Sequence, residues 1–358
     1  MLKYKNVRSL GGAMIKDVIQ KVKIGSLDLE DKFFDSLRAD YEGFNEWLMR
    51  KSNQDAYVFI ENKEIHGFLY LKDETESSDE ITPFFEEKRR LKVGTFKINA
   101  HGTVLGQRFL SIILRTMFEE NFKFTYVTVF EKQKGLIALL EKFGFMMWGV
   151  KNNGELVYFK DDRVTDNLYI DYPRINNSTN KFLLSIYPQF HTDLFPESKL
   201  NTETNHYVED LSFTNTIEKI YLSAMKNIKD IQSGDLIVIY RTSDKIRAEY
   251  SSVATSICSV VEVKNINEFS NSEAFLSYCG KGSIFSQTEL MNMWRNRKYP
   301  YIIKMLYNVP LRKRITRNQL IEEVGLNRNA YFGCLEITDH EFNKILEIGE
   351  VDEGFIID

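Results

Sequence analysis

LKVGTFKINA, HGTVLG and QRFLSIILRTMFEE follow one another over residues 91–120, and this segment sets the architecture of the first half of the chain. Apolar and β-branched residues run to Ala100, which is typical of a strand, and a short turn with two glycines comes next. Beyond the turn, apolar residues recur at helical spacing: Leu105, Phe109, Ile112, Ile113 and Met117. We therefore predict a strand, a tight turn and a helix.

This turn is suited to binding an anion. The first turn of a helix carries unpaired backbone N–H groups at the positive end of the helix dipole. Gly102 and Gly106 would let the backbone approach a phosphate or pyrophosphate closely. The alternative is a purely structural turn.

The elements around this segment predict a mixed sheet flanked by helices. A first strand over 18–25, helices over 27–51 and a hairpin over 56–72 precede it. A strand over Lys123 to Phe130, a helix over Gln133 to Phe143 and the pair FGFMMWGV and ELVYFK follow it. The fold class is α/β.

The chain resembles the GNAT superfamily of acyl-CoA-dependent N-acetyltransferases in two places: the turn, and the stretch VTVFEKQKGLIALLEKFGF at residues 127–145. The resemblance covers roughly residues 17–160. The resemblance implies a GNAT-like domain over 1–160 with acetyl-CoA as co-substrate. It departs from the family at four positions. His101 stands where Arg or Gln is preferred, Val104 replaces the first Gly, Gln133 replaces Asn, and Leu140 replaces the Tyr that protonates the thiolate.

The resemblance also implies which residues bind acyl-CoA. Backbone groups of the strand would pair with the pantetheine amides, the turn would cradle the pyrophosphate, and the start of the second helix would face the pantetheine arm. These positions are Phe96, Lys97, Ile98, His101, Gly102, Thr103, Val104, Leu105, Gly106, Gln107 and Gln133. For Gln133, a helix-terminal polar residue is an equally good interpretation, and we assign no catalytic residue. Glu86, Glu87 and Glu131 are near the right strands for a base, and Tyr126 is a candidate acid.

Length and composition limit the number of domains, the location of the protein and the kinds of site it can contain. The 358 residues, 43% hydrophobic, are too many for one core, so two domains are expected. We expect a cytoplasmic protein without a membrane span or signal peptide. Three dispersed cysteines and five scattered histidines predict neither a disulfide framework nor a metal site.

Residues 161–179 lose periodicity and gather Asp, Asn and Ser, which predicts a linker before a second domain over 180–358. A strand and helix over FLLSIYPQFHTDLFP, the Gly234-Asp235 turn before LIVIY, and VATSICSVVEV predict a small β-barrel with helices. The spacing resembles the PUA-like superfamily with its ASCH and EVE groups, many of which bind RNA or modified bases. A helix over Gln287 to Arg297, a strand over Tyr301 to Tyr307 and a closing helix over His340 to Ile348 complete the domain.

Basic residues beside Trp294, Tyr299 and Tyr301 suggest contact with RNA or another nucleic acid, because the charge holds phosphates and the rings stack bases. A solvated basic face leading into a helix capped by Thr316 or Asn318 is the alternative. The basic residues are Arg295, Arg297, Lys298, Arg312, Lys313, Arg314 and Arg317.

Two functions follow. The first is an N-acetyltransferase that acts on an amine of an unknown acceptor, with the second domain recruiting the substrate, for which RNA or an RNA-associated protein is the candidate. The second is a non-catalytic regulatory or nucleic-acid-binding protein with a degenerate GNAT domain.

Overall fold

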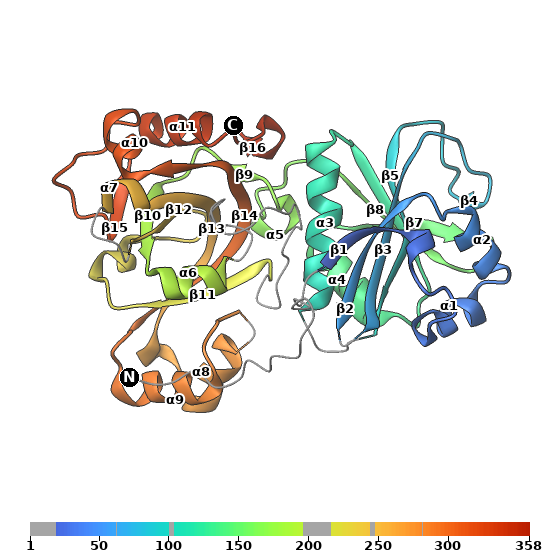
Figure 1. The fold of residues 1–358 in the computed structure, drawn as a ribbon, viewed down its shortest axis with the longest axis horizontal. Coiled ribbons are helices and arrows are strands. Elements are labelled where there is room, and N and C mark those ends of the chain that lie inside the picture. Colours follow the sequence, from blue (N-terminus) through green and yellow to red (C-terminus); the bar gives the residue numbers. More distant parts are fainter. Residues whose placement is uncertain (1–18, 62, 100–103, 196–215, 244–247, 281) are drawn as a thin grey trace.

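The computed structural model describes residues 19–61, 63–99, 104–195, 216–243, 248–280 and 282–358. Its elements form two halves that lie side by side in Figure 1. The first half contains an eight-stranded sheet and the second a six-stranded sheet, and a two-stranded pair lies at the C-terminal end.

The sheet of the first half has the strand order β1-β2-β3-β5-β6-β8-β7-β4. Its central neighbours β5 and β6 are parallel, and the other neighbouring pairs are antiparallel. The predicted strands and hairpin are confirmed with small shifts of their ends. The strands are β1 (Ile19–Lys23), β2 (Asp55–Glu61), β3 (Glu64–Glu74), β4 (Ile81–Thr82), β5 (Arg90–Ile98), β6 (Phe124–Val129), β7 (Met146–Lys151) and β8 (Leu156–Asp161).

Helices cover both faces of this sheet. α1 (Asp35–Asp40) and α2 (Phe44–Arg50) pack over β2 and β3 on one face. The two longer helices, α3 (Leu105–Glu119) and α4 (Lys134–Lys142), lie on the other face, as the apolar spacing predicts. Leu140 is 0% exposed and belongs to the core between α4 and the sheet.

The segment 161–179, predicted as a linker, contains short ordered elements. α5 (Leu168–Asp171) is capped by Asn167, whose side chain accepts from Tyr169 N and Ile170 N. β9 (Ile175–Asn176) pairs with β16 (Ile356–Ile357) near the C-terminus. Elements of two to four residues are too short to show a hydrophobic period, so the sequence pattern does not reveal them.

The second half is built on the strand order β11-β14-β13-β12-β10-β15. The predicted small barrel is not confirmed, because the edge strands β11 and β15 do not pair in the described part of the chain. Gly234 has φ +95° in the predicted turn, and Thr316 is the N-cap of α10. The strands are β10 (Lys181–Ile186), β11 (Glu218–Ser223), β12 (Leu236–Arg241), β13 (Val253–Asn265), β14 (Tyr301–Thr316) and β15 (Cys334–Ile337), and the helices are α6 (Pro188–Leu194), α7 (Ala248–Ser251), α8 (Ser272–Cys279), α9 (Gln287–Asn296), α10 (Arg317–Glu322) and α11 (Asp339–Ile348).

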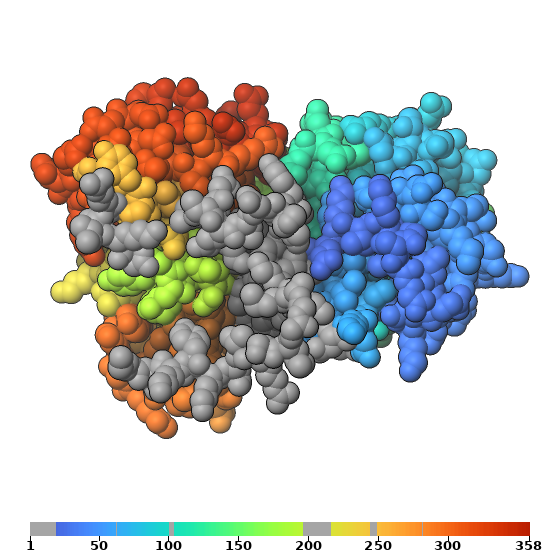
Figure 2. All heavy atoms as spheres, in the orientation of Figure 1, coloured from blue at the N-terminus to red at the C-terminus, as the bar shows by residue number. Residues whose placement is uncertain are grey.

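One hydrophobic cluster joins the two halves. It extends from Leu91 on β5 through α3 to Leu306 on β14 and Ile345 on α11. In Figure 2 the spheres of the two halves touch where orange atoms of the second half meet teal atoms of the first half. Among the helices that the structure describes, none is long and apolar enough to cross a membrane.

Candidate functional site

The central parallel strands separate at their carboxyl ends. Pairing between β5 and β6 runs from Leu91 opposite Thr125 to Val93 opposite Val127 and then stops. β5 nevertheless continues to Ile98, and β6 continues to Val129. No described strand pairs with β5 on that side beyond Val93. Backbone polar groups along this edge are therefore available to an extended ligand.

A β-bulge explains the separation. In the ladder between β3 and β5, Tyr70 lies opposite Thr95 and Leu71 lies opposite Val93, so Gly94 has no partner. An extra residue on one strand bends that strand and increases its twist. A Cβ at Gly94 would come within 2.7 Å of the Tyr70 ring, so glycine permits the close approach. We refer to the space between the diverging ends of β5 and β6 as the gap.

The first turn of α3 offers an anion site at the same edge, because α3 and α4 follow two parallel strands. Val104 precedes the helix and makes no side-chain cap, and the first turn contains no acidic residue. The backbone N–H groups of this turn thus have neither a capping oxygen from Val104 nor a competing carboxylate within the turn. Gln133 is the residue before α4, again without a side-chain cap.

The predicted turn residues have different surroundings. His101, Gly102 and Thr103 lie outside the described residues. At Gly106 a Cβ would be 3.0 Å from Leu139 Cδ2, so this glycine permits close packing of α3 on α4. The side chain of Gln107 donates from Nε2 to Glu218 Oε2 of the second half at 3.2 Å.

The three predicted strand residues all lie on the diverging half of β5. Phe96 and Ile98 pack against the core on the α3 side. Lys97 points to the opposite face, where Nζ donates to Ser36 Oγ at 2.7 Å and to the Phe33 carbonyl. Burial lowers the pKa of Lys97.

On this opposite face, α1 bridges the gap. Its first residues contact β5 through Lys97, and its last residues contact the β6 side. Lys132 Nζ pairs with Asp40 Oδ1 at 2.6 Å. Tyr41, directly after α1, lies 5.7 Å from Phe130 between ring centroids.

Tyr41 also contacts a buried carboxylate that the sequence did not single out. Glu155 is 1% exposed and precedes β8. Its Oε1 accepts from Tyr41 Oη at 2.5 Å and Thr128 Oγ1 at 3.0 Å, and its Oε2 accepts from Asn153 Nδ2 at 2.9 Å. Thr128 is the first residue of β6 after the pairing with β5 stops.

The donors to Glu155 are all neutral, and no cation of the described chain pairs with this carboxylate. Burial raises the pKa of Tyr41, and the hydrogen bond to Glu155 raises it further, so Tyr41 stays protonated at neutral pH. Glu155 and the partly exposed Tyr41 thus form a hydrogen-bonded pair that connects a buried carboxylate to the protein surface, which is a route for proton transfer.

The residues proposed from sequence as acids or bases are placed differently. Glu86, Glu87 and Glu131 are exposed on the surface. Tyr126 lies opposite Lys92 in the β5–β6 register, before the gap, and its hydroxyl donates to Glu74. Burial raises the pKa of Tyr126, and Glu74 raises it further. Glu155 could not be recognised because a lone glutamate after Asn-Gly in a hairpin is usually solvent-exposed.

The predicted basic cluster does not form one surface. Arg295, Arg297 and Lys298 precede β14, whereas the other four cations lie at or beyond its far end, near α10 (Figure 1). A strand of sixteen residues can span about 50 Å. Several of the side chains also have partners within the chain. Arg297 lies 3.6 Å from the Trp294 ring, Arg312 pairs with Asp352 at 3.5 Å, and Arg314 donates to two backbone carbonyls.

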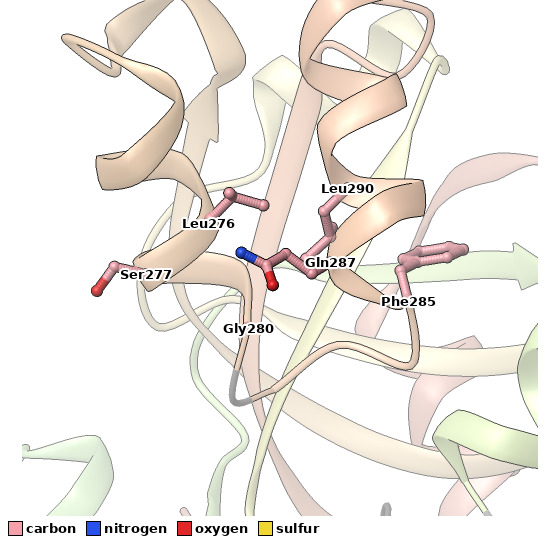
Figure 3. A pocket seen from close by; sticks show the side chains of 6 residues that line it. All are labelled: Leu276, Ser277, Gly280, Phe285, Gln287 and Leu290. Carbon is pink, nitrogen blue, oxygen red and sulfur yellow. The ribbon is translucent and has the colours of Figure 1, made fainter.

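A hollow lies between α8 and α9, far in sequence from the gap (Figure 3). The Gln287 amide points between the two helices toward Leu276. The lining residues that the structure describes carry no charge, so their chemistry does not indicate a substrate. The lining residues are Leu276, Ser277, Gly280, Phe285, Gln287 and Leu290.

No protein-family model matches the sequence, and no curated protein matches it. Among solved structures, the chain is similar to an ASCH protein from Zymomonas mobilis, with 14% identity, a TM-score of 0.29 and coverage of 47% of this chain and 94% of that one. It is also similar to a GNAT-family acetyltransferase from Streptococcus agalactiae, with 17% identity, a TM-score of 0.28 and coverage of 36% and 79%. A GNAT-family acetyltransferase from Elizabethkingia anophelis with acetyl-CoA bound covers 41% of this chain and 99% of its own, with 13% identity and a TM-score of 0.28. These likenesses are distant, and each covers less than half of this chain.

Proposed function

We propose that the first half of the chain binds acyl-CoA in the gap and transfers the acyl group to an amine. The observation that carries this proposal is the loss of β5–β6 pairing at the Gly94 bulge, at the edge of the sheet where α3 begins after Val104, whose own side chain makes no cap. An extended ligand with amide groups would pair with the open edge of Phe96 to Ile98. A pyrophosphate would bind the N–H groups at the start of α3.

The residues of this chain fit such a ligand in two independent ways. The strand edge offers backbone donors and acceptors to a chain that contains amides, and the helix terminus offers a positive dipole end to an anion. The first turn of α3 adds no negative charge of its own. The ligand itself supplies the activated thioester carbonyl.

The acceptor amine would approach from the opposite face, beside α1. An amine must lose a proton before it can attack a carbonyl. Tyr41 is partly exposed and bonded to Glu155, so its oxygen can take a proton from an ammonium group as its own proton passes to the carboxylate. The amine is left neutral, and the proton is held on Glu155. Attack by the neutral amine forms the C–N bond and breaks the C–S bond, so CoA leaves as a thiolate and takes up the proton that the amine nitrogen loses. Leu140 is an apolar core residue and contributes no acid, so the thiolate leaves without help from this position.

The test is calorimetric titration of acetyl-CoA into the full chain and into Val104→Asp. A carboxylate at residue 104 would face the positive end of α3, so it should not destabilise the helix. The same charge would repel a pyrophosphate. We expect the wild-type chain to bind and the variant to bind at least about tenfold more weakly, a loss of about 1.4 kcal/mol.

Val104→Asn is the matched control, because it has nearly the same shape as Val104→Asp without the charge. It should retain most of the affinity. Replacement of Gly106 by a larger residue would be a poorer control, because the new side chain would disturb the packing of α3 on α4. If the wild-type chain does not bind acetyl-CoA, the proposal is wrong. Binding without transfer to any amine would favour the regulatory alternative.

A further inference from the structure

α3 presents one stripe of side chains to the rest of the molecule. Gln107, Ser111, Arg115 and Phe118 are spaced by four, four and three residues, which places them on one helix face. The opposite face packs on the sheet of the first half. α3 therefore contacts the two halves with two different faces.

Each residue of the stripe contacts the chain beyond residue 161. Ser111 Oγ lies 3.0 Å from Tyr172 Oη, and Arg115 Nη2 donates to the Asn308 carbonyl at 3.3 Å. The ring of Phe118 lies 6.4 Å from that of Phe355 between centroids. At the start of the helix, Gln107 contacts Glu218.

Glu218, the first residue of β11, receives donors from four elements. Besides Gln107 of α3, its carboxylate accepts from Lys142 of α4 at 2.9 Å and Tyr169 of α5 at 2.6 Å. Lys304 of β14 pairs with it at 3.0 Å. Two of these donors, from α3 and α4, belong to the helices that begin beside the gap.

This carboxylate is ionised at neutral pH. Burial alone would raise its pKa, but the hydrogen bonds from Tyr169 and Lys142 outweigh burial and hold the pKa at about 2. Because the pKa of Glu218 is lower in the folded chain than in the unfolded chain, the contacts stabilise the fold fully above the ordinary pKa of a glutamate. This stabilisation is lost only as the pH falls toward 2. The hydrogen bonds and ion pairs of Glu218 are therefore present throughout the physiological pH range.

We propose that Glu218 is a positioning residue that holds the first turn of α3 against the last turn of α4. The second half would thereby set the geometry of the proposed acyl-CoA site, and ligands of the two halves would affect each other's affinity through β11 and α3. The acyl-CoA part of this inference rests on the proposed function. The part that concerns α3 can be tested without any ligand.

The test compares amide hydrogen exchange in the full chain with that in Glu218→Gln. The amide keeps the volume but loses the charge that binds four donors. We expect the backbone amides in the second turn of α3, which donate within the helix, to exchange at least about tenfold faster in the variant. Glu262→Gln is the control, because Glu262 binds Tyr278 at 2.9 Å and Lys264 at 3.2 Å, both within the second half. Unchanged exchange in α3, or an equal increase in the control, would overturn the proposal.

Acetyl-CoA titration separates the two proposals. If the wild-type chain binds and Glu218→Gln binds about fivefold or more weakly, the coupling is supported. Equal affinities would overturn the coupling but leave the proposed function intact. If the wild-type chain does not bind, the proposed function fails and hydrogen exchange still decides the role of Glu218. Should Glu218→Gln not fold, Lys142→Met removes one donor and should still speed exchange at the end of α4.

Discussion

At the scale of single residues, two buried carboxylates in the first 180 residues have opposite environments. Asp171 lies 3.5 Å from Arg174, and its oxygens accept from Thr165 N. Glu155 is more deeply buried and has only neutral donors. A buried carboxylate beside a buried cation is part of a balanced pair, whereas a buried carboxylate with neutral donors alone has no opposite charge to compensate it.

This contrast predicts different effects of matched amide substitutions. Asp171→Asn leaves Arg174 buried without its carboxylate and should lower the free energy of unfolding by about 3 kcal/mol. Glu155→Gln leaves no buried cation without its partner and should change stability by less than about 1 kcal/mol. Urea unfolding at neutral pH measures both. A large loss of stability in Glu155→Gln would mean that this carboxylate has a structural role.

Glu155→Gln should also abolish acyl transfer while the affinity for acetyl-CoA stays the same. The reason is that Glu155 is placed to receive a proton rather than to bind the ligand. Release of free thiol from acetyl-CoA with a panel of primary amines is the measurement. Turnover in Glu155→Gln equal to that of the wild-type chain would rule out this role.

Residue-level prediction from sequence is limited by what a local pattern contains. Leu140 could be assigned to the core because its helix has a regular apolar spacing. For Gly106 the sequence favours a ligand turn over a purely structural turn, and only the position of Leu139 shows that this glycine permits close helix packing. The burial of the Glu155 carboxylate depends on Tyr41 and Thr128, which are distant in sequence. No local sequence signal therefore indicates that Glu155 is buried.

At the scale of elements, the strand and the helix on either side of residue 100 were predictable, but the bulge within the strand was not. A glycine inside a strand pattern suggests a bulge only in general terms. The register between β3 and β5 shows that Gly94 is the unpaired residue. The barrel of the second half was predicted from short strands and turns, but strand order depends on long-range pairing that this pattern does not specify.

Two glycine substitutions test the element-level argument. Gly94→Ala would bring a Cβ within 2.7 Å of Tyr70, a buried ring that cannot move freely, and should lower stability by about 1–3 kcal/mol. Gly135 lies in α4, and nothing is within 4 Å of its Cβ position. Gly135→Ala should therefore raise stability by about 0.5–1 kcal/mol through helix propensity. Thermal unfolding of the two variants should shift in opposite directions, and a harmless Gly94→Ala would show that the bulge tolerates a side chain.

At the scale of the whole molecule, composition predicts two units joined by a linker, whereas the halves share a hydrophobic cluster. The sequence of α3 could not show this, because a polar stripe with Gln107, Ser111 and Arg115 is normally the solvent face of an amphipathic helix. Here that stripe contacts the second half. Neither half can unfold alone without exposing a face of α3 that the other half covers.

We therefore expect both halves to unfold in one transition. Trp47 and Trp148 lie in the first half and Trp294 in the second, and the chain has three tryptophans. Trp294→Phe leaves fluorescence that reports the first half, and the double substitution Trp47→Phe with Trp148→Phe leaves fluorescence that reports the second. In urea, each variant should show one transition, and the midpoint seen by fluorescence should equal the midpoint seen by circular dichroism of the same variant. If the two probes gave different midpoints, the contacts of α3 would be too weak to couple the halves, and the inference on Glu218 would lose its physical basis.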